Sequence, residues 1–485
     1  MKEKSIKKNY IFNTCYQILL VIVPFITTPY LSRVLGVDGV GLYSFASSIV
    51  AYFTVFACLG TGTYGQRAIS YVADKKEERS RVFFETFIFR LTMTIITLVF
   101  YGIYLFFVKE NFIIYLILSL NIVNIALDIA WFLYGMEEFQ KTVIRSTIFK
   151  ILNIIFIFVF IKKPSDLTTY ILGTMILNVL GALSLWVYVP KYVTKVHNLK
   201  PFRDVKTIIR LFIPTIAIQV YTLLDKSMLG VFAPDYVENG YYEQAEKVTK
   251  ICLTLVTSLG TVMIPRIGKT FKEGNFEKIR TYMYKSYSFI WFLAIPIMFG
   301  LIAISSIFVP IFFGDGYEKV GVILPILSSI VVIIGLSNVN GFQYFVPIGK
   351  ENVLTLTVVV GAVVNLILNF FLIPRYYAIG ACIASVIAEG CVTAVGFIYI
   401  HKSRELSIRN IIKLSINYFI SGLVMLGVLL LIKPMLNTSI YSLFILILCG
   451  GIIYLVMLLI LRDKFFLEMI KLGIDILKKK LKRNK

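Results

Sequence analysis

Residues 225–250 read DKSMLGVFAPDYVENGYYEQAEKVTK, and this stretch decides how the rest of the chain must fold. It places Asp225 and Lys226 near the end of one long apolar run and four further charges in the next run. An ionisable side chain at bilayer depth costs on the order of 2.5–3.5 kcal/mol, so such groups normally line a water-filled cavity. The four charges follow the spacing i, i+3, i+4 and i+7 on one helical face and are Glu243, Glu246, Lys247 and Lys250. Each Glu can pair with the Lys four residues later. We therefore expect other helices to surround this face and enclose a hydrophilic cavity.

The composition is that of an integral membrane protein. Of the 485 residues, 58% are hydrophobic, and the mean hydropathy is +0.82, well above that of soluble domains. The net charge is +22, but the basic residues sit in short segments between apolar runs, which favours membrane topology over nucleic-acid binding. The six cysteines and two histidines show no ligand spacing, and no nucleotide-binding motif is present. The sequence predicts no metal, no cofactor and no catalytic residue.

Apolar runs of about 20 residues predict fourteen membrane spans. Their approximate ranges are 10–32, 40–62, 82–107, 112–134, 143–161, 168–190, 207–232, 239–262, 284–311, 320–345, 352–373, 377–400, 410–432 and 440–461. With the N-terminus in the cytoplasm, 37 Lys and Arg fall in cytoplasmic segments or at the cytoplasmic ends of spans and seven in outer loops, so we expect both termini to be cytoplasmic. The tail, 462–485, alternates apolar and basic residues, which predicts an amphipathic helix on the inner leaflet of the cytoplasmic membrane.

A weak internal repeat relates the first half of the chain to the second. The run GLYSFA at 41–46 aligns with GYYEQA at 240–245, and Arg67 then matches Arg266 at the same offset. Equivalent spans are six apart, an even number, so the two halves have the same orientation in the membrane. The sequence predicts an all-α membrane protein with two pseudo-symmetric six-helix lobes, 1–200 and 201–404, then two further helices over 405–461 and the basic tail 462–485.

The candidate cavity residues are the polar and charged side chains within predicted spans: Lys247, Lys250, Lys226, Glu243, Glu246, Gln219, Arg90 and Lys150. Lys226 lies seven residues after Gln219, on the same helical face. For Lys247 and Lys250 the alternative is a structural zipper in which both carboxylates neutralise both amines. Arg90 and Lys150 enter from the cytoplasmic ends of their spans, so snorkelling to the interface is their alternative. A surplus of cations over acids would attract an anionic ligand.

Three embedded acids are candidates for ion coupling: Asp225, Asp128 and Glu389. Asp225 can take up a proton or a cation, or it can simply pair with Lys226 or Lys247. Asp128 and Glu389 are too short to reach the interface as a lysine does, but either can instead be a packing partner for another helix.

Three motifs carry a family resemblance: LGVDGVGLY at 35–43, WFLYGME at 131–137 and IGACIAS at 379–385. In this order, with fourteen spans, the chain resembles the polysaccharide transporter family of Wzx-type flippases. That family belongs to the multidrug/oligosaccharidyl-lipid/polysaccharide exporter (MOP) superfamily, with the MATE transporters and lipid II flippases. The resemblance implies a V-shaped cavity between two lobes and translocation of an undecaprenyl-pyrophosphate-linked oligosaccharide, either a capsular polysaccharide unit or a teichoic acid precursor.

The resemblance also implies cations near the pyrophosphate, a role open to Lys247, Lys250 and Lys226. Family members often carry arginines there, whereas this chain has lysines. It further implies that the last two helices guide the lipid tail and that glycan polymerases or ligases are partners. We expect alternating access without ATP and no enzymatic activity. The alternatives are a MATE-like drug/cation antiporter, which calls for a net acidic cavity, and a membrane glycan polymerase or transferase, which calls for a large outer loop.

Overall fold

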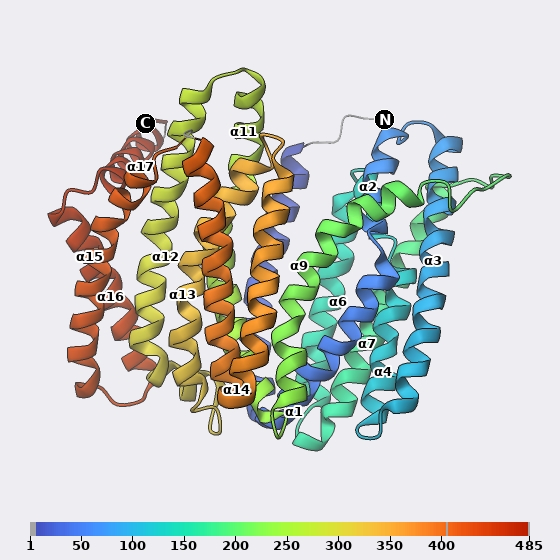
Figure 1. The fold of residues 1–485 in the computed structure, drawn as a ribbon, viewed down its shortest axis with the longest axis horizontal. Coiled ribbons are helices and arrows are strands. Elements are labelled where there is room, and N and C mark those ends of the chain that lie inside the picture. The colour runs from blue at the N-terminus through green and yellow to red at the C-terminus, as the bar shows by residue number, and fades with distance from the viewer. Residues whose placement is uncertain (1–5, 404–405, 484–485) are drawn as a thin grey trace. The chain divides into compact units, whose positions relative to one another are not determined.

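The computed structural model describes residues 6–403 and 406–483 (Figure 1). The side chains of residues 6–18, 20–21, 211, 213–215, 217–218, 220–221, 261 and 476–483 lie outside this description. So do the predicted lobe boundary at 404/405 and the last two residues of the predicted tail. The chain divides into two compact units, Met1–Gly240 and Tyr241–Lys485, which we describe separately as unit 1 and unit 2.

Unit 1 is built from helices that pack around α1. Its elements are α1 Ile6–Cys58, α2 Thr61–Tyr71, α3 Lys76–Phe107, α4 Phe112–Leu127, α5 Ala130–Gly135, α6 Phe139–Phe160, η1 Pro164–Asp166, α7 Leu167–Ser184, η2 Leu185–Tyr188, α8 Val189–Tyr192 and α9 Val205–Phe232. Two apolar cores hold them together, one where α4 packs on α1 and α7 and one around Phe83 and Phe132.

Unit 2 packs around the long helix α12, whose Tyr287, Ile290 and Ala294 are fully buried. Its elements are α10 Val237–Thr257, of which the first four residues belong to unit 1, α11 Gly260–Lys272, α12 Phe276–Phe313, α13 Val320–Asn338, η3 Val339–Phe345, α14 Glu351–Ser403, α15 Ile408–Ile432, η4 Lys433–Met435, α16 Ile440–Ile460 and α17 Lys464–Arg483. Every regular element of the described residues is a helix.

The helices account for the fourteen predicted spans. Eleven helical stretches among the described residues are long and apolar enough to cross a membrane. Two of these contain a kink, at Gly36 and at Tyr377, and each therefore supplies two crossings. The 28-residue α9 adds one more. The chain is thus an all-helical, multi-pass membrane protein, as its apolar runs predict.

The two kinks depend on left-handed backbone conformations. Gly36 has a φ of 70°, which glycine adopts without steric cost because it lacks a Cβ. Tyr377 has a φ of 50°, in a region that a bulky side chain rarely occupies. The two arms of α14 run back alongside each other after this kink, and Gly361 of the first arm contacts Val392 of the second (Figure 1).

The predicted repeat is visible in the pattern of elements. The short helix α2 begins at Thr61 and α11 begins at Gly260, so Arg67 and Arg266 occupy matching helices. The fourth crossing of each half is also interrupted. In the first half α4 ends at Leu127 and α5 begins at Ala130, and in the second half α13 passes into the π-helix η3.

Two repeat-related glycines make a reciprocal contact within unit 1. A Cβ placed on Gly41 would lie 1.7 Å from the carbonyl oxygen of Tyr236, and a Cβ on Gly240 would lie 2.3 Å from the carbonyl oxygen of Val37. Val37 lies four residues before Gly41, and Tyr236 lies four residues before Gly240, so the two contacts join equivalent positions of the repeat. Equivalent positions of the repeat therefore contact each other in both directions.

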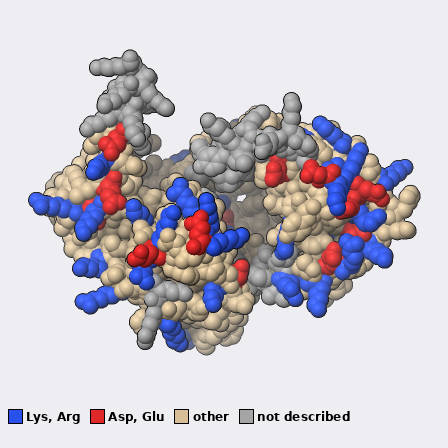
Figure 2. Space-filling model, turned by 90° about the horizontal axis from the view of Figure 1, so that it is seen from above, with Lys and Arg blue, Asp and Glu red and all other residues tan. Residues whose placement is uncertain are grey.

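Charged side chains gather at helix ends. In unit 1 the end that carries α2, and in unit 2 the end that carries α11 and α17, bear clusters of Lys and Arg (Figures 1 and 2). The tail predicted to be an amphipathic helix is α17, whose described side chains include exposed Leu467 and Leu472 beside exposed Lys464 and Lys471.

Candidate functional site

The charged stripe predicted on the eighth span lies on α10 of unit 2. The Lys247 Nζ is 3.2 Å from a Glu243 carboxylate oxygen, and the Lys250 Nζ is 2.7 Å from a Glu246 carboxylate oxygen. Both i, i+4 pairs expected from the spacing therefore form. The Glu side chains are only 15% exposed, whereas Lys247 is 36% and Lys250 57% exposed. The helix thus holds its carboxylates against the protein and presents its ammonium groups at the surface of unit 2.

The other half of the opening stretch lies on α9 of unit 1. Asp225 is buried, while Lys226 is half-buried and Gln219 is exposed. The Asn239 amide donates to the Lys226 carbonyl oxygen at 2.7 Å, and the Ser227 hydroxyl lies 2.9 Å from the Tyr52 hydroxyl. Adjacent residues on a helix point to different sides. Asp225 accordingly faces the helix packing of unit 1, and its neighbour Lys226 is the more accessible of the two.

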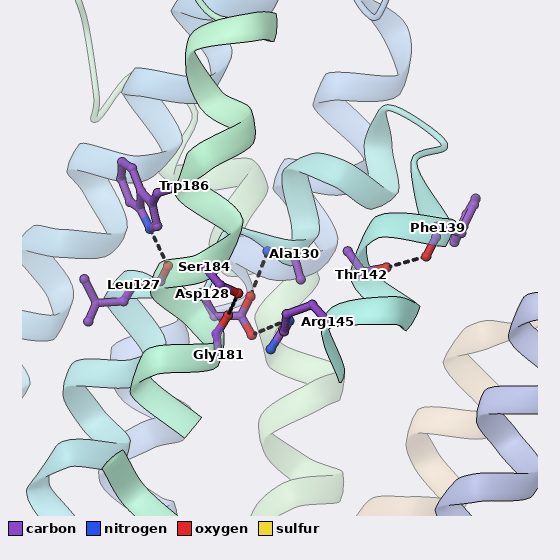
Figure 3. Close-up of polar contacts among 9 residues, drawn as sticks. All are labelled: Leu127, Asp128, Ala130, Phe139, Thr142, Arg145, Gly181, Ser184 and Trp186. Atoms are coloured by element: carbon purple, nitrogen blue, oxygen red, sulfur yellow. Dashed lines mark hydrogen bonds and ion pairs between the residues drawn. The ribbon is translucent and has the colours of Figure 1, made fainter. Parts of the chain in front are cut away.

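A second polar centre occupies the break between α4 and α5 (Figure 3). Asp128 Oδ1 accepts a 2.8 Å hydrogen bond from the Ala130 amide, and Trp186 Nε1 donates to the Leu127 carbonyl oxygen at 2.8 Å. These contacts satisfy backbone groups that the helix break releases, which is essential where water is scarce. The other oxygen, Asp128 Oδ2, lies 3.6 Å from an Arg145 guanidinium nitrogen. Asp128 is therefore tied to α6 by an ion pair.

Arg145 is not among the predicted cavity residues, because it lies at the cytoplasmic start of the predicted span 143–161. In the structure it belongs to α6, and its side chain is only 17% exposed. Its place within the predicted span 143–161 was the available signal. Its partner Asp128 lies at the break between α4 and α5, so no residue spacing within one helix predicts this pair.

Within the described part of the chain, Arg90 and Lys150 are embedded cations that form no ion pair with a carboxylate. Arg90 on α3 is only 6% exposed, and its Nε has no hydrogen-bond partner in the described part of the chain. The charges of Arg90 and Asp128 interact electrostatically, but the two side chains do not form an ion pair. Lys150 on α6 is half-buried and has no carboxylate within 4 Å among the described residues. Burial of a guanidinium without an ion-pair partner is energetically costly.

Glu389 lies half-buried on the second arm of α14. One helical turn before it, the Ser385 hydroxyl lies 3.4 Å from the Tyr242 hydroxyl of α10. Glu389 therefore sits near the packing of α14 on the charged helix of unit 2. No group of three or more His, Cys, Asp or Glu among the described residues is arranged to hold a metal ion.

The arrangement of helices matches solved transporter structures. A lipid II flippase MurJ in an inward closed conformation superposes with a TM-score of 0.75 at 18% identity, over 94% of this chain and 99% of that one. An inward-facing multidrug resistance MATE family transporter of the MOP superfamily superposes with a TM-score of 0.63 at 17% identity, over 79% of this chain and 94% of that one. The chain therefore has the fold of MOP superfamily transporters.

Sequence comparison assigns the chain to one protein family. The chain belongs to the family described as polysaccharide biosynthesis protein, which matches residues 6–271, more than half of its length. Its resemblance to Wzx-type flippases is thereby confirmed.

Curated relatives extend over most of the chain. A putative O-antigen transporter of Shigella dysenteriae is 27% identical over 76% of this chain and 92% of its own length. A putative O-antigen transporter of Escherichia coli is 24% identical over 83% and 98%. The capsular polysaccharide biosynthesis protein CapF of Staphylococcus aureus is 24% identical over 81% and 99%. The prediction of a transporter rather than an enzyme agrees with these relatives.

Proposed function

We propose that the chain moves an oligosaccharide linked to undecaprenyl pyrophosphate across the cytoplasmic membrane. The observation that carries this proposal is the surplus of positive charge within the membrane spans. Arg90 and Lys150 have no acidic partner among the described residues, so a ligand with phosphate oxygens would supply the missing charge. The relatives named as O-antigen transporters support a glycan as cargo.

The charged face of α10 has the chemistry to receive the pyrophosphate. Lys247 and Lys250 reach outward from carboxylates that are held close to the protein, so each ammonium retains donors for a second oxygen partner. Glu243 and Glu246 act as positioning residues for these lysines. Lys226 and Gln219 on α9 are the further cavity residues that we propose. A polyprenyl chain needs no such polar surface and can stay in the lipid.

The transport cycle that fits this fold is alternating access between the six-helix lobes 1–200 and 201–404. The even number of crossings and the basic helix ends support a topology with both termini in the cytoplasm. Each lobe moves largely as a rigid body, and the cavity opens to one side at a time. Glycan polymerases or ligases would receive the cargo on the outer side.

Depletion of the protein in its native host identifies the cargo. We expect one lipid-linked glycan to accumulate on the cytoplasmic leaflet, where it is protected from a glycan-cleaving enzyme added to intact cells. The names of the relatives favour an O-antigen-like or capsular unit, and a teichoic acid precursor is the other candidate. Depletion without accumulation of any polyprenyl-linked glycan would refute the proposal.

Charge reversal tests the lysines on α10. Lys247→Glu and Lys250→Glu each place a third acid on a face that already carries Glu243 and Glu246. We expect each variant to lose transport by at least about tenfold, since one lost charge-assisted contact is worth about 1.4 kcal/mol or more. Lys272→Glu, at an exposed position on α11, is the matched control and keeps activity. Full transport by both α10 variants at normal membrane levels would remove these lysines from the site.

We further infer that transport is coupled to the membrane potential or to a cation gradient through the embedded acids. Asp225 is the strongest candidate because it is buried in α9 beside the accessible Lys226. Glu389 is a second candidate, whereas the ion pair with Arg145 gives Asp128 a structural role. Transport in proteoliposomes should fall when ionophores collapse both gradients, and Asp225→Asn should remove this dependence. Transport indifferent to both gradients would contradict the coupling.

A further inference from the structure

A cavity of about 610 Å³ opens at the basic end of unit 2, between α12, α15 and the turn from α16 to α17. Three cationic side chains line it: Lys413 on α15, Arg462 in the turn and Lys464 at the start of α17. None of the three forms an ion pair with another residue that the structure describes. Most of its lining comes from α15 and the turn before α17, which follow the six-helix repeat, and it shares no residue with the cavity proposed for transport.

The one carboxylate that lines the cavity, Asp463, is hydrogen-bonded within the protein. It is buried and accepts hydrogen bonds from the Tyr418 hydroxyl at 3.0 Å, the Asn417 amide at 3.3 Å and the Phe466 backbone amide at 3.0 Å. These bonds join α15 to the first turn of α17. Asp463 therefore fixes the shape of the cavity, and the cations around it remain available to a ligand.

Aromatic packing and an ion pair hold the start of α17 against α12 and so define the cavity wall. The rings of Phe465 and Phe466 contact the Phe292 ring of α12 at 6.1 and 5.8 Å between centroids, and Lys285 of α12 lies 3.4 Å from Glu468 of α17. Arg462 has a φ of 49°, a conformation that side chains other than glycine rarely adopt. The turn thus holds an arginine where a glycine would fit more easily.

A second cavity and an exposed apolar stripe adjoin this cavity. A neighbouring cavity of about 1030 Å³ shares Tyr284 and Asn410 with it and adds the basic side chain of Arg409. Next to Lys413, α15 exposes Ile412 and Ile416, which follow one helical face away from the cations. A cationic pocket that continues into an exposed apolar stripe matches a molecule with an anionic head and acyl chains.

We propose that this cavity binds the phosphodiester headgroup of an anionic membrane phospholipid, whose acyl chains lie along α15. Three cations at the end of transmembrane helices supply charge-assisted hydrogen bonds to phosphate oxygens, and Arg462 can contact two of these oxygens at once. The apolar stripe beside Lys413 favours a lipid over free phosphate, because a soluble anion gains nothing from Ile412 or Ile416. The site therefore anchors unit 2 to an anionic leaflet.

The test compares three full-length proteins in detergent by native mass spectrometry. They are the wild type, the triple variant Lys413→Gln/Arg462→Gln/Lys464→Gln, and the matched control Lys272→Gln/Lys278→Gln/Lys471→Gln, which removes three exposed charges from the same end of unit 2. Each is titrated with phosphatidylglycerol and with phosphatidylcholine. Thermal unfolding in phosphatidylcholine nanodiscs checks that all three proteins are folded.

We expect the wild type and the control to retain phosphatidylglycerol at about a tenfold lower lipid concentration than phosphatidylcholine. The cavity variant should lose this preference. Lys413→Gln alone, at an exposed helix position, should lose part of it and covers the case in which the triple variant does not fold.

Three outcomes would overturn the proposal. The cavity variant and Lys413→Gln could both keep the preference of the control, or both triple variants could lose it equally, which would indicate general attraction to a basic surface. Alternatively, inorganic phosphate or pyrophosphate could displace phosphatidylglycerol at equal concentration, which would assign the cavity to a soluble anion. Because the readout is phospholipid binding, failure here leaves the proposed transport function untouched.

Discussion

At the scale of single residues, two embedded arginines of unit 1 have opposite surroundings. Arg145 lies 3.6 Å from Asp128, which also caps the break before α5, whereas Arg90 is buried and forms no ion pair among the described residues; the Nε of each arginine lacks a hydrogen-bond partner there. An ion pair satisfies the first charge. We propose that the second binds a ligand, so the two residues should respond to substitution in opposite ways.

Replacing the unpaired arginine should separate stability from function. Arg90→Met removes a buried charge and keeps the packing volume, so the midpoint of thermal unfolding should stay equal or rise. Transport of the lipid-linked glycan should fall by about tenfold or more, because the variant lacks the cation that we propose for the phosphate. Both quantities can be measured on one reconstituted preparation. Lower stability together with full transport would assign Arg90 a structural role.

The paired arginine should behave in the reverse manner. Asp128→Asn keeps an acceptor for the Ala130 amide but leaves Arg145 without its counter-charge, which should cost about 1–3 kcal/mol of stability. The double variant Asp128→Asn/Arg145→Met removes both charges and should recover most of this loss. Denaturant unfolding in micelles measures each variant. A double variant less stable than Asp128→Asn would show that the pair is not the source of the effect.

The residue scale also shows what the sequence can and cannot predict. Glu243 and Lys247 pair as expected because four residues separate them on one helix, a distance fixed by helix geometry. Asp128 and Arg145 also pair, but they come from two elements whose approach depends on the tertiary fold. Spacing predicts contacts within a helix, and only the fold decides contacts between helices.

At the scale of elements, the repeat appears as an interrupted fourth crossing in each half and as the close contact of Gly41 and Gly240 with opposite segments. The alignment of residues 41–46 with 240–245 predicted the pseudo-symmetry, and the matching starts of α2 and α11 agree with it. The kink at Tyr377 follows a gap between two apolar runs that contains Pro374. A tyrosine gives no sequence signal for a left-handed backbone, whereas Gly36 does.

Substitution of Gly41 and Gly240 tests whether the repeat-related segments need their close contact. Gly41→Ala would place a methyl group 1.7 Å from a backbone carbonyl oxygen, and Gly240→Ala would place one at 2.3 Å from another. A backbone atom cannot move aside as a side chain can, so we expect each variant to fold poorly and to lose transport. Gly102→Ala, at an open helix position, is the control and should be neutral or slightly stabilising. Membrane levels and transport equal to the control would show that the segments separate freely.

At the scale of the whole molecule, charge distribution and crossing number together set the topology. Fourteen crossings with basic ends support our proposal that the turn after α15 lies outside and the end of α11 lies inside. In a cysteine-free background, Asn437→Cys should react with a membrane-impermeant maleimide added to intact cells. Lys272→Cys should react only after permeabilisation. The reverse pattern would invert the topology and with it the proposed direction of transport.

The central claim is that embedded cations receive the phosphate-bearing head of the cargo, and equilibrium binding tests it most directly. The measurement compares a glycan on undecaprenyl pyrophosphate with the same glycan on undecaprenol, for the wild type and for Arg90→Gln/Lys150→Gln in nanodiscs. We predict that the wild type binds the pyrophosphate form at least about tenfold more tightly and that the variant binds both forms alike. Equal binding of the two forms by the wild type would contradict the account.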